Sequence, residues 1–128
     1  MNNSTDRANQ LEQRFIRFAA SIISLSSKLP DTAEGKHVRS QVLRSGTATA
    51  ANYGEARGAE SRADFVHKLK IVSKELNETT IWLELIAKSS WISPENLVAI
   101  VAENRELCRI IAASIRTVRA GAGGSSGQ

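Results

Sequence analysis

The chain has 128 residues and a mass of 13.9 kDa, which suits one domain because a single hydrophobic core usually takes about 100 to 200 residues. Its residues are 41% hydrophobic but only 5% aromatic, and they include two prolines, a balance typical of an all-α fold built on aliphatic side chains. A net charge of +4 is too small to establish nucleic-acid binding, and the only cysteine, Cys108, excludes an internal disulfide and a multi-cysteine zinc site.

The first ten residues are polar, so the sequence lacks the apolar run behind a basic start that marks a secretory signal. No apolar stretch approaches the roughly 18 residues that a membrane-spanning helix needs. We therefore expect a cytoplasmic protein with no membrane partner.

A first helix is predicted over residues 7–29, because its apolar residues recur every three or four positions and form one stripe. The stripe consists of Leu11, Phe15, Phe18, Ile22, Leu25 and Leu29. Pro30 ends this helix, and Asp31 with Glu34 predicts a capping box at the start of a second helix over 33–57.

The second helix contains a stretch of small residues, RSGTATAANYGEARG, at positions 44–58. Gly46, Ala50 and Gly54 recur every four residues, and each glycine costs a helix about 1 kcal/mol relative to alanine. Close packing against another helix offsets that cost, so we expect these residues to face either a helix of the same chain or another subunit. A phosphate-binding loop is excluded, because Glu55 stands where such a loop has lysine.

A third helix is predicted over residues 61–90, capped by Ser61 with Asp64, and a fourth over 94–119, where Pro94 takes the first helical position. Residues 121–128, GAGGSSGQ, have nothing to bury and are predicted to form a disordered tail. The connectors are short, which favours antiparallel neighbours. The expected fold is an antiparallel up-down-up-down four-helix bundle.

Two carboxylate-x-x-His pairs, Glu34 with His37 and Asp64 with His67, have the spacing of di-iron bundle proteins. They begin consecutive antiparallel helices, so they lie near opposite ends of the bundle, roughly 20 Å apart at about 1.5 Å rise per residue. No Ser or Cys is placed beside a His that would activate it. We expect no metal, no cofactor and no catalytic residue.

The middle two helices carry polar residues on or beside their core faces: Arg44, Asn52, Glu55, Glu75 and Glu78. In an antiparallel hairpin, residue 44 lies roughly level with residues 74 to 78, so Arg44 is placed to pair with one of the two later glutamates. We interpret the set as a structural polar network that fixes the register of the helices.

Charge is distributed unevenly along the predicted bundle. The end that holds both termini and the turn after the second helix carries eleven cations and five anions, or +6, and the other end carries −2. Helix dipoles explain basic residues only at helix C-termini, so we expect this basic end to bind phosphate or an acidic partner. Its candidate nucleic-acid-binding residues are Arg14, Arg17, Arg57, Arg62, Lys68, Lys70, Lys74, Arg109, Arg116 and Arg119.

Several local patterns resemble the 23S rRNA intervening-sequence protein family of bacterial four-helix bundles. They are Arg44-Ser45, the Ala51-Asn52 pair with Glu55, Ala63 to Lys68 (ADFVHK), Lys74 to Leu85 (KELNETTIWLEL), and Lys28 to Pro30 (KLP). The resemblance covers residues 10–118, and the chain departs from it at Gly54 and Ala56, where the packing of the second helix could differ.

This resemblance implies a homopentamer without enzymatic activity. It extends to the accessory protein of diversity-generating retroelements, a basic pentamer that binds nucleic acid and a reverse transcriptase. Two hypotheses follow: a homo-oligomeric bundle that binds RNA or DNA through its basic end, and a protein-interaction scaffold without nucleic-acid binding.

Overall fold

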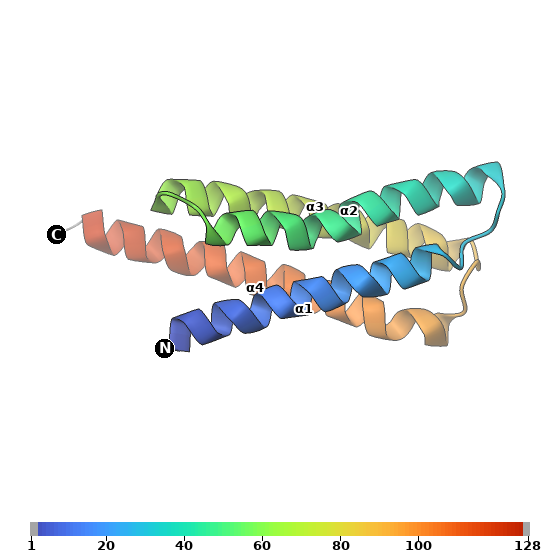
Figure 1. Cartoon of the computed structure of the whole chain (residues 1–128), viewed down its shortest axis with the longest axis horizontal. Coiled ribbons are helices and arrows are strands. Elements are labelled where there is room, and N and C mark those ends of the chain that lie inside the picture. Colours follow the sequence, from blue (N-terminus) through green and yellow to red (C-terminus); the bar gives the residue numbers. More distant parts are fainter. Residues whose placement is uncertain (1–2, 127–128) are drawn as a thin grey trace.

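The computed structural model describes residues 3–126, which fold into an antiparallel bundle of four helices. The helices are α1 (Asn3–Ser26), α2 (Ala33–Arg57), α3 (Arg62–Lys88) and α4 (Pro94–Ser126). Helix α1 begins, and α4 ends, at the same end of the bundle as the α2–α3 turn (Figure 1). The predicted fold class is confirmed.

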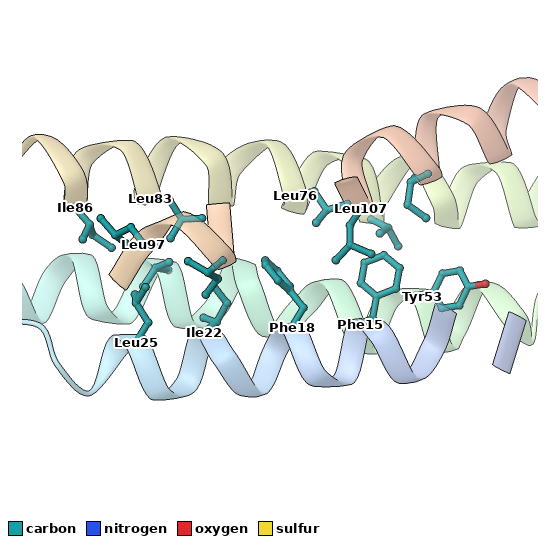
Figure 2. Packing of buried hydrophobic residues seen from close by; sticks show 14 of the residues in the cluster. Phe15, Phe18, Ile22, Leu25, Tyr53, Leu76, Leu83, Ile86, Leu97 and Leu107 are labelled. Carbon is teal, nitrogen blue, oxygen red and sulfur yellow. The ribbon is translucent and has the colours of Figure 1, made fainter. Parts of the chain in front are cut away.

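The predicted apolar stripe of α1 and the apolar residues that recur every three or four positions along α3 form most of the core. Phe15, Ile22, Leu69, Leu76 and Leu83 are all at most 2% exposed, and Figure 2 shows side chains from all four helices meeting between the ribbons. In α4, the spacing of Leu97, Val101, Asn104, Cys108 and Ile111 predicts the buried stripe. Leu97, Asn104 and Ile111 are buried as predicted, but the positions between them shift, which is a partial rotation of the stripe. Ile100 and Leu107 are buried there, whereas Val101 and Cys108 are only half-buried.

The connection from α1 to α2 differs from its prediction. Helix α1 ends at Ser26 rather than at residue 29, because the residue before a proline is disfavoured in helical conformation. Thr32, not Asp31, caps α2 and accepts a hydrogen bond from the Gly35 backbone N–H at 3.0 Å.

Arg39 holds this connection against α2. Its guanidinium donates hydrogen bonds to the backbone carbonyl oxygens of Ser26 at 3.2 Å and Leu29 at 2.9 Å. Both carbonyls lie at or just after the C-terminus of α1, where the helix offers no backbone N–H four residues later to bond them. Gly35 leaves room for the Pro30 carbonyl, whose oxygen would lie 2.0 Å from a Cβ at that position. The loop therefore depends on an arginine and a glycine with no obvious signal in the sequence.

The start of α3 follows the predicted cap. Ser61 accepts a hydrogen bond from the Asp64 backbone N–H at 3.0 Å, while Asp64 accepts one from the Glu60 N–H at 3.3 Å. At the other end of α3, Ser90 adopts a left-handed conformation with φ of 57°, and the Trp91 N–H donates to the Ile86 carbonyl at 3.4 Å. This is the Schellman arrangement that commonly ends a helix.

Gly46 allows α1 and α2 to approach each other closely. It is buried, and a Cβ at this position would lie 2.7 Å from both Cγ1 and Cγ2 of Ile22 on α1. Gly54, two turns later, has only the Glu12 Oε2 atom within 4 Å of such a Cβ, at 3.5 Å. Gly46 therefore packs within its own chain, against α1.

Helices α1 and α4 make far fewer close contacts with each other than the three sequential helix pairs do. Figure 1 shows α4 starting on one side of α1, passing behind it and ending on the other side. The flank of α1 that faces α4 is polar, with Arg14, Arg17, Ser21, Ser24 and Lys28 lining hollows between the two helices. A polar flank gains little from burial, which explains the crossed arrangement.

The structure differs from the predicted tail at the C-terminus. Helix α4 continues to Ser126, through most of the segment predicted as disordered, and residues 127–128 lie outside the described residues. The hydrogen bonds of a helix are local, and no proline stops this one. A Cβ at Gly121 would meet nothing within 4 Å, so this extension stands clear of the bundle.

The Gly46–Ile22 contact predicts opposite effects for two glycine-to-alanine substitutions in α2. Gly46→Ala forces Ile22 to move and should lower the free energy of unfolding by about 1 to 2 kcal/mol, because overpacking costs more than helix propensity returns. The Cβ added by Gly54→Ala makes only an ordinary van der Waals contact, so this substitution should raise the free energy of unfolding by up to about 1 kcal/mol. Urea unfolding followed by circular dichroism measures both, and equal effects would contradict the role given to Gly46.

Candidate nucleic-acid interface

Three of the candidate cations are engaged in ion pairs that join helices. Arg14 donates from Nε and Nη2 to the two carboxylate oxygens of Glu103, each at 2.8 Å, and so joins α1 to α4. This hydrogen bonding raises the pKa of Arg14 above its ordinary value despite the opposing effect of burial. A bidentate pair of this kind fixes direction as well as distance.

The other two paired cations lie at the α2–α3 end. Arg57 donates from Nη1 to Asn9 Oδ1 at 2.8 Å and to Glu12 Oε1 at 2.6 Å, which joins α2 to α1. Lys68 donates to Glu55 Oε1 at 3.2 Å, which joins α3 to α2. A phosphate group would have to compete with a carboxylate for each of these side chains.

A second group of cations lies on the exposed sides of α3 and α4, and we call it the α3–α4 basic face. It consists of Lys70, Lys74, Arg105, Arg109, Arg116 and Arg119, all exposed. The four arginines are spaced by 4, 7 and 3 residues, so they lie along one side of α4. Within the described residues, Arg109 alone among these six cations has a carboxylate partner, Glu106 on the same helix.

The register of α3 against α4 brings two acid-free segments side by side. Asn104 donates from Nδ2 to Thr80 Oγ1 at 2.6 Å and to the Leu76 carbonyl at 3.3 Å, and these bonds fix the pairing of the helices. In this register, residues 65–74 run beside residues 107–116. Neither segment contains Asp or Glu, so the positive charge of the face is not cancelled locally.

The remaining candidates lie outside this face. Arg17 lines the hollows between α1 and α4, and Arg62 begins α3, where it makes an interaction of its own. Arg105 is absent from the sequence-based set, because it lies in the half of the fourth helix that belongs to the other, acidic end of the predicted bundle. Its position four residues before Arg109 is the signal that would have found it.

The structural polar network is brought together only in part. Arg44 reaches Glu75 at 3.3 Å and also pairs with Glu78, whose Oε2 accepts a hydrogen bond from Trp82 Nε1 at 3.0 Å. Asn52 is half-buried and makes no side-chain hydrogen bond with the described residues, and Glu55 pairs with Lys68 as described above.

The buried polar contacts that lock the register are different ones. Ser45 Oγ and Thr79 Oγ1 lie 2.8 Å apart, and both residues are completely buried between α2 and α3. Together with the Asn104 bonds, this contact ties α3 to both of its neighbours. Short polar side chains on a predicted core face were the signal for these residues.

Cys108 is half-buried against α3, with its Sγ 3.9 Å from Asn77 Oδ1. Burial raises the pKa of its thiol above the ordinary value, and a hydrogen bond with Thr80 offsets this only in part. A nucleophilic cysteine has a lowered pKa, so the environment of Cys108 disfavours that role.

Metal-ligand geometry and membrane spans were both sought in residues 3–126. No three His, Cys, Asp or Glu side chains gather there in a way that would hold a metal ion. None of the four helices combines the length and the apolar character that crossing a membrane requires.

Comparison with known proteins gives one family and a similar solved structure. The model of the family described as 23S rRNA-intervening sequence protein matches residues 7–113. A 1.70 Å crystal structure from Bacteroides thetaiotaomicron VPI-5482, of a protein of unknown function from the S23 ribosomal protein family, is 36% identical, with a TM-score of 0.79. The alignment covers 85% of this chain and 97% of that one. No curated protein matches the chain.

The raised pKa of Cys108 predicts slow modification by a thiol reagent. At each pH below 9, the folded protein should react with an aromatic disulfide more slowly than the same chain in urea, because it holds less thiolate and shields the sulfur. Stopped-flow absorbance over a pH series measures both rates. Equal rates at pH 7 to 8 would show that the thiol is neither buried nor perturbed.

Proposed function

Because the chain belongs to the 23S rRNA-intervening sequence protein family, we propose that it is a non-enzymatic, homo-oligomeric helical bundle that binds RNA or DNA through its basic end. The α3–α4 basic face carries this proposal. Five of its six cations lack a carboxylate partner among the described residues, so they can bind phosphate without first breaking an ion pair.

The geometry of the face suits a phosphate backbone better than base edges. Arg105 and Arg109 are about 6 Å apart along α4, and Arg116 and Arg119 about 4.5 Å, from a rise of 1.5 Å per residue. Exposed, flexible cations on the outside of two packed helices contact phosphates but offer no fixed pattern of donors to a groove. We therefore expect binding that depends strongly on salt and weakly on sequence.

Self-association is supported by apolar side chains on the outside of the bundle. Ile16 and Ile23 are spaced by seven residues on α1 and are 46% and 54% exposed, and Val98 on α4 is 65% exposed. Large apolar residues that recur on one exposed helix face are typical of an interface. A pentamer, as the family resemblance implies, would repeat the basic face five times and raise its potential for nucleic acid.

The partners proposed with this function are a second copy of the chain and a nucleic acid, together with a reverse transcriptase-like protein suggested by the resemblance to the retroelement accessory protein. Structured RNA is the first probe, because the names of both the matching family and the similar crystal structure's family refer to ribosomal components. Duplex DNA of the same length is the second.

Removing two arginines of the face should weaken RNA binding and its salt dependence. For the double variant Arg116→Gln/Arg119→Gln, we expect the slope of log K against log salt to become shallower by about 1.4 to 1.8, because each of the two lost phosphate contacts contributes about 0.7 to 0.9. Fluorescence anisotropy of a labelled RNA hairpin between 50 and 300 mM salt measures this slope.

The matched control is Lys36→Gln/Lys88→Gln, which removes the same charge from exposed positions at the opposite end of the bundle. This control should bind RNA like the parent chain. If the parent chain shows no RNA or DNA binding even at low salt, the proposal fails and the scaffold hypothesis takes its place. Equal weakening by both double variants would attribute binding to net charge instead of the face.

The homo-oligomer is tested by mass in solution. Light scattering after size exclusion should give a multiple of 13.9 kDa, and a pentamer gives five times that mass. A monomer at micromolar concentration would contradict the oligomer and the repeated basic face. Whether a single copy binds RNA is decided by the anisotropy experiment alone.

A further inference from the structure

A hollow of about 670 Å³ opens between α1, α2 and α4 at the end where the chain termini lie. It exists because α1 and α4 cross and separate beyond the Arg14–Glu103 pair, as Figure 1 shows for the ribbons. The residues that define its chemistry are Arg7, Leu11, Arg14, Arg17, Tyr53 and Ile110. This hollow lies on a different side of the molecule from the α3–α4 basic face.

One wall of the hollow is positively charged along its length. Arg7, Arg14 and Arg17 are spaced by seven and three residues, which places them on one side of α1. Among the residues that the structure describes, no Asp or Glu lines the hollow. Glu103, the partner of Arg14, lines the neighbouring hollow instead, and Arg7 and Arg17 have no ion-pair partner within residues 3–126.

The other residues that line the hollow are Ala8, Leu11, Tyr53 and Ile110, together with the polar residues Gln10 and Ser114, whose hydroxyl donates to the Ile110 carbonyl at 2.9 Å. Leu11 and Ile110 contribute aliphatic surface, the apolar floor of the hollow, and the Tyr53 ring is stacked on Phe15 with the ring centroids 5.0 Å apart. Figure 2 shows the Tyr53 hydroxyl oxygen pointing away from the packed apolar side chains. Tyr53 is only 5% exposed, yet its hydroxyl has no hydrogen-bond partner among the described residues.

We propose that this hollow binds a nucleoside phosphate, with its phosphates along the arginine wall and its base on the apolar floor beside the Tyr53 hydroxyl. Guanidinium groups bind phosphate oxygens through charge-assisted hydrogen bonds. The flat face of a base buries apolar surface against Leu11 and Ile110, and a polar atom on its edge satisfies the Tyr53 hydroxyl.

Simpler ligands use only part of this site. Inorganic phosphate or pyrophosphate would bind the arginines but would leave the apolar side chains and the Tyr53 hydroxyl in contact with water. A purely apolar ligand would cover the floor and desolvate two unpaired guanidinium groups, which is costly. The volume of the hollow lies within the range of about 300 to 1,000 Å³ that is usual for small-molecule sites.

The inference does not depend on the α3–α4 basic face that carries the proposed function. Tyr53, Leu11, Arg7 and Ile110 do not belong to the α3–α4 basic face, so either site can exist without the other. The same ligand chemistry comes from a free nucleotide or from the 5′-phosphorylated end of a nucleic-acid strand, and the experiment separates these two sources.

Isothermal titration of the purified full-length chain with ADP, adenosine and pyrophosphate tests the site. We expect ADP to bind at least about tenfold more tightly than either partial ligand, because only ADP contacts both wall and floor. Arg7→Gln and Tyr53→Phe should each weaken ADP binding about three- to tenfold. Tyr53→Phe keeps the ring that packs on Phe15, so circular dichroism should show an intact fold.

The matched control is Lys88→Gln, which removes one positive charge from an exposed position at the opposite end of the bundle and should leave ADP binding unchanged. Equal weakening by Arg7→Gln and Lys88→Gln would overturn the site, since it would attribute ADP binding to general charge attraction. Pyrophosphate binding as tight as ADP, or no ADP binding at millimolar concentration, would also overturn it.

Oligonucleotides with and without a 5′-phosphate distinguish the two sources of ligand. A preference for the phosphorylated strand that Arg7→Gln abolishes supports capture of a strand end, whereas ADP binding without this preference supports a free nucleotide. Failure of the proposed function is recognised separately, because hairpin RNA without a 5′-phosphate would then fail to bind the parent chain while ADP still binds.

Discussion

The close contact between Gly46 on α2 and Ile22 on α1 sets the arrangement on which the rest of the bundle depends. Because Gly46 has no side chain, Ile22 can pack directly against the α2 backbone. A Cβ on Gly46 would lie only 2.7 Å from two carbon atoms of Ile22. On its other side, α2 is tied to α3 by the buried Ser45–Thr79 contact at 2.8 Å. Helix α2 is therefore fixed on both flanks, and it determines how far α1 and α3 stand from each other.

The basic side chains in this protein form two groups: those that make ion pairs with a neighbouring helix, and those that are exposed without an acidic residue opposite them. Arg14, Arg57 and Lys68 face glutamates on neighbouring helices and join those helices together. The cations of the α3–α4 basic face point away from the bundle, and the segments around them hold almost no acid. The same residue types thus provide structure at one place and an interaction surface at another.

The helices and the all-α bundle could be predicted from the sequence, because the spacing of residues such as Phe15, Ile22 and Leu76 is a property of each helix alone. The partner of Gly46, the rotation of α4 and the crossing of α1 over α4 could not, since they depend on how helices sit against one another. Likewise, the sequence indicated a basic end, but only the register set by Asn104 separates the α3–α4 basic face from the ion-paired cations. The hollow around Tyr53 arises from the crossing and has no linear pattern.

The order of the helix contacts has a consequence for how the chain reaches this structure. All three extensive interfaces join helices that are consecutive in the sequence, whereas the contact between the first and last helices is slight. Each extensive interface can form by closing one short loop, which costs little entropy. Such a low contact order is typical of chains that fold within microseconds to milliseconds. The α2–α3 hairpin, with its buried hydroxyl pair and short connection, contains the most extensive of these interfaces.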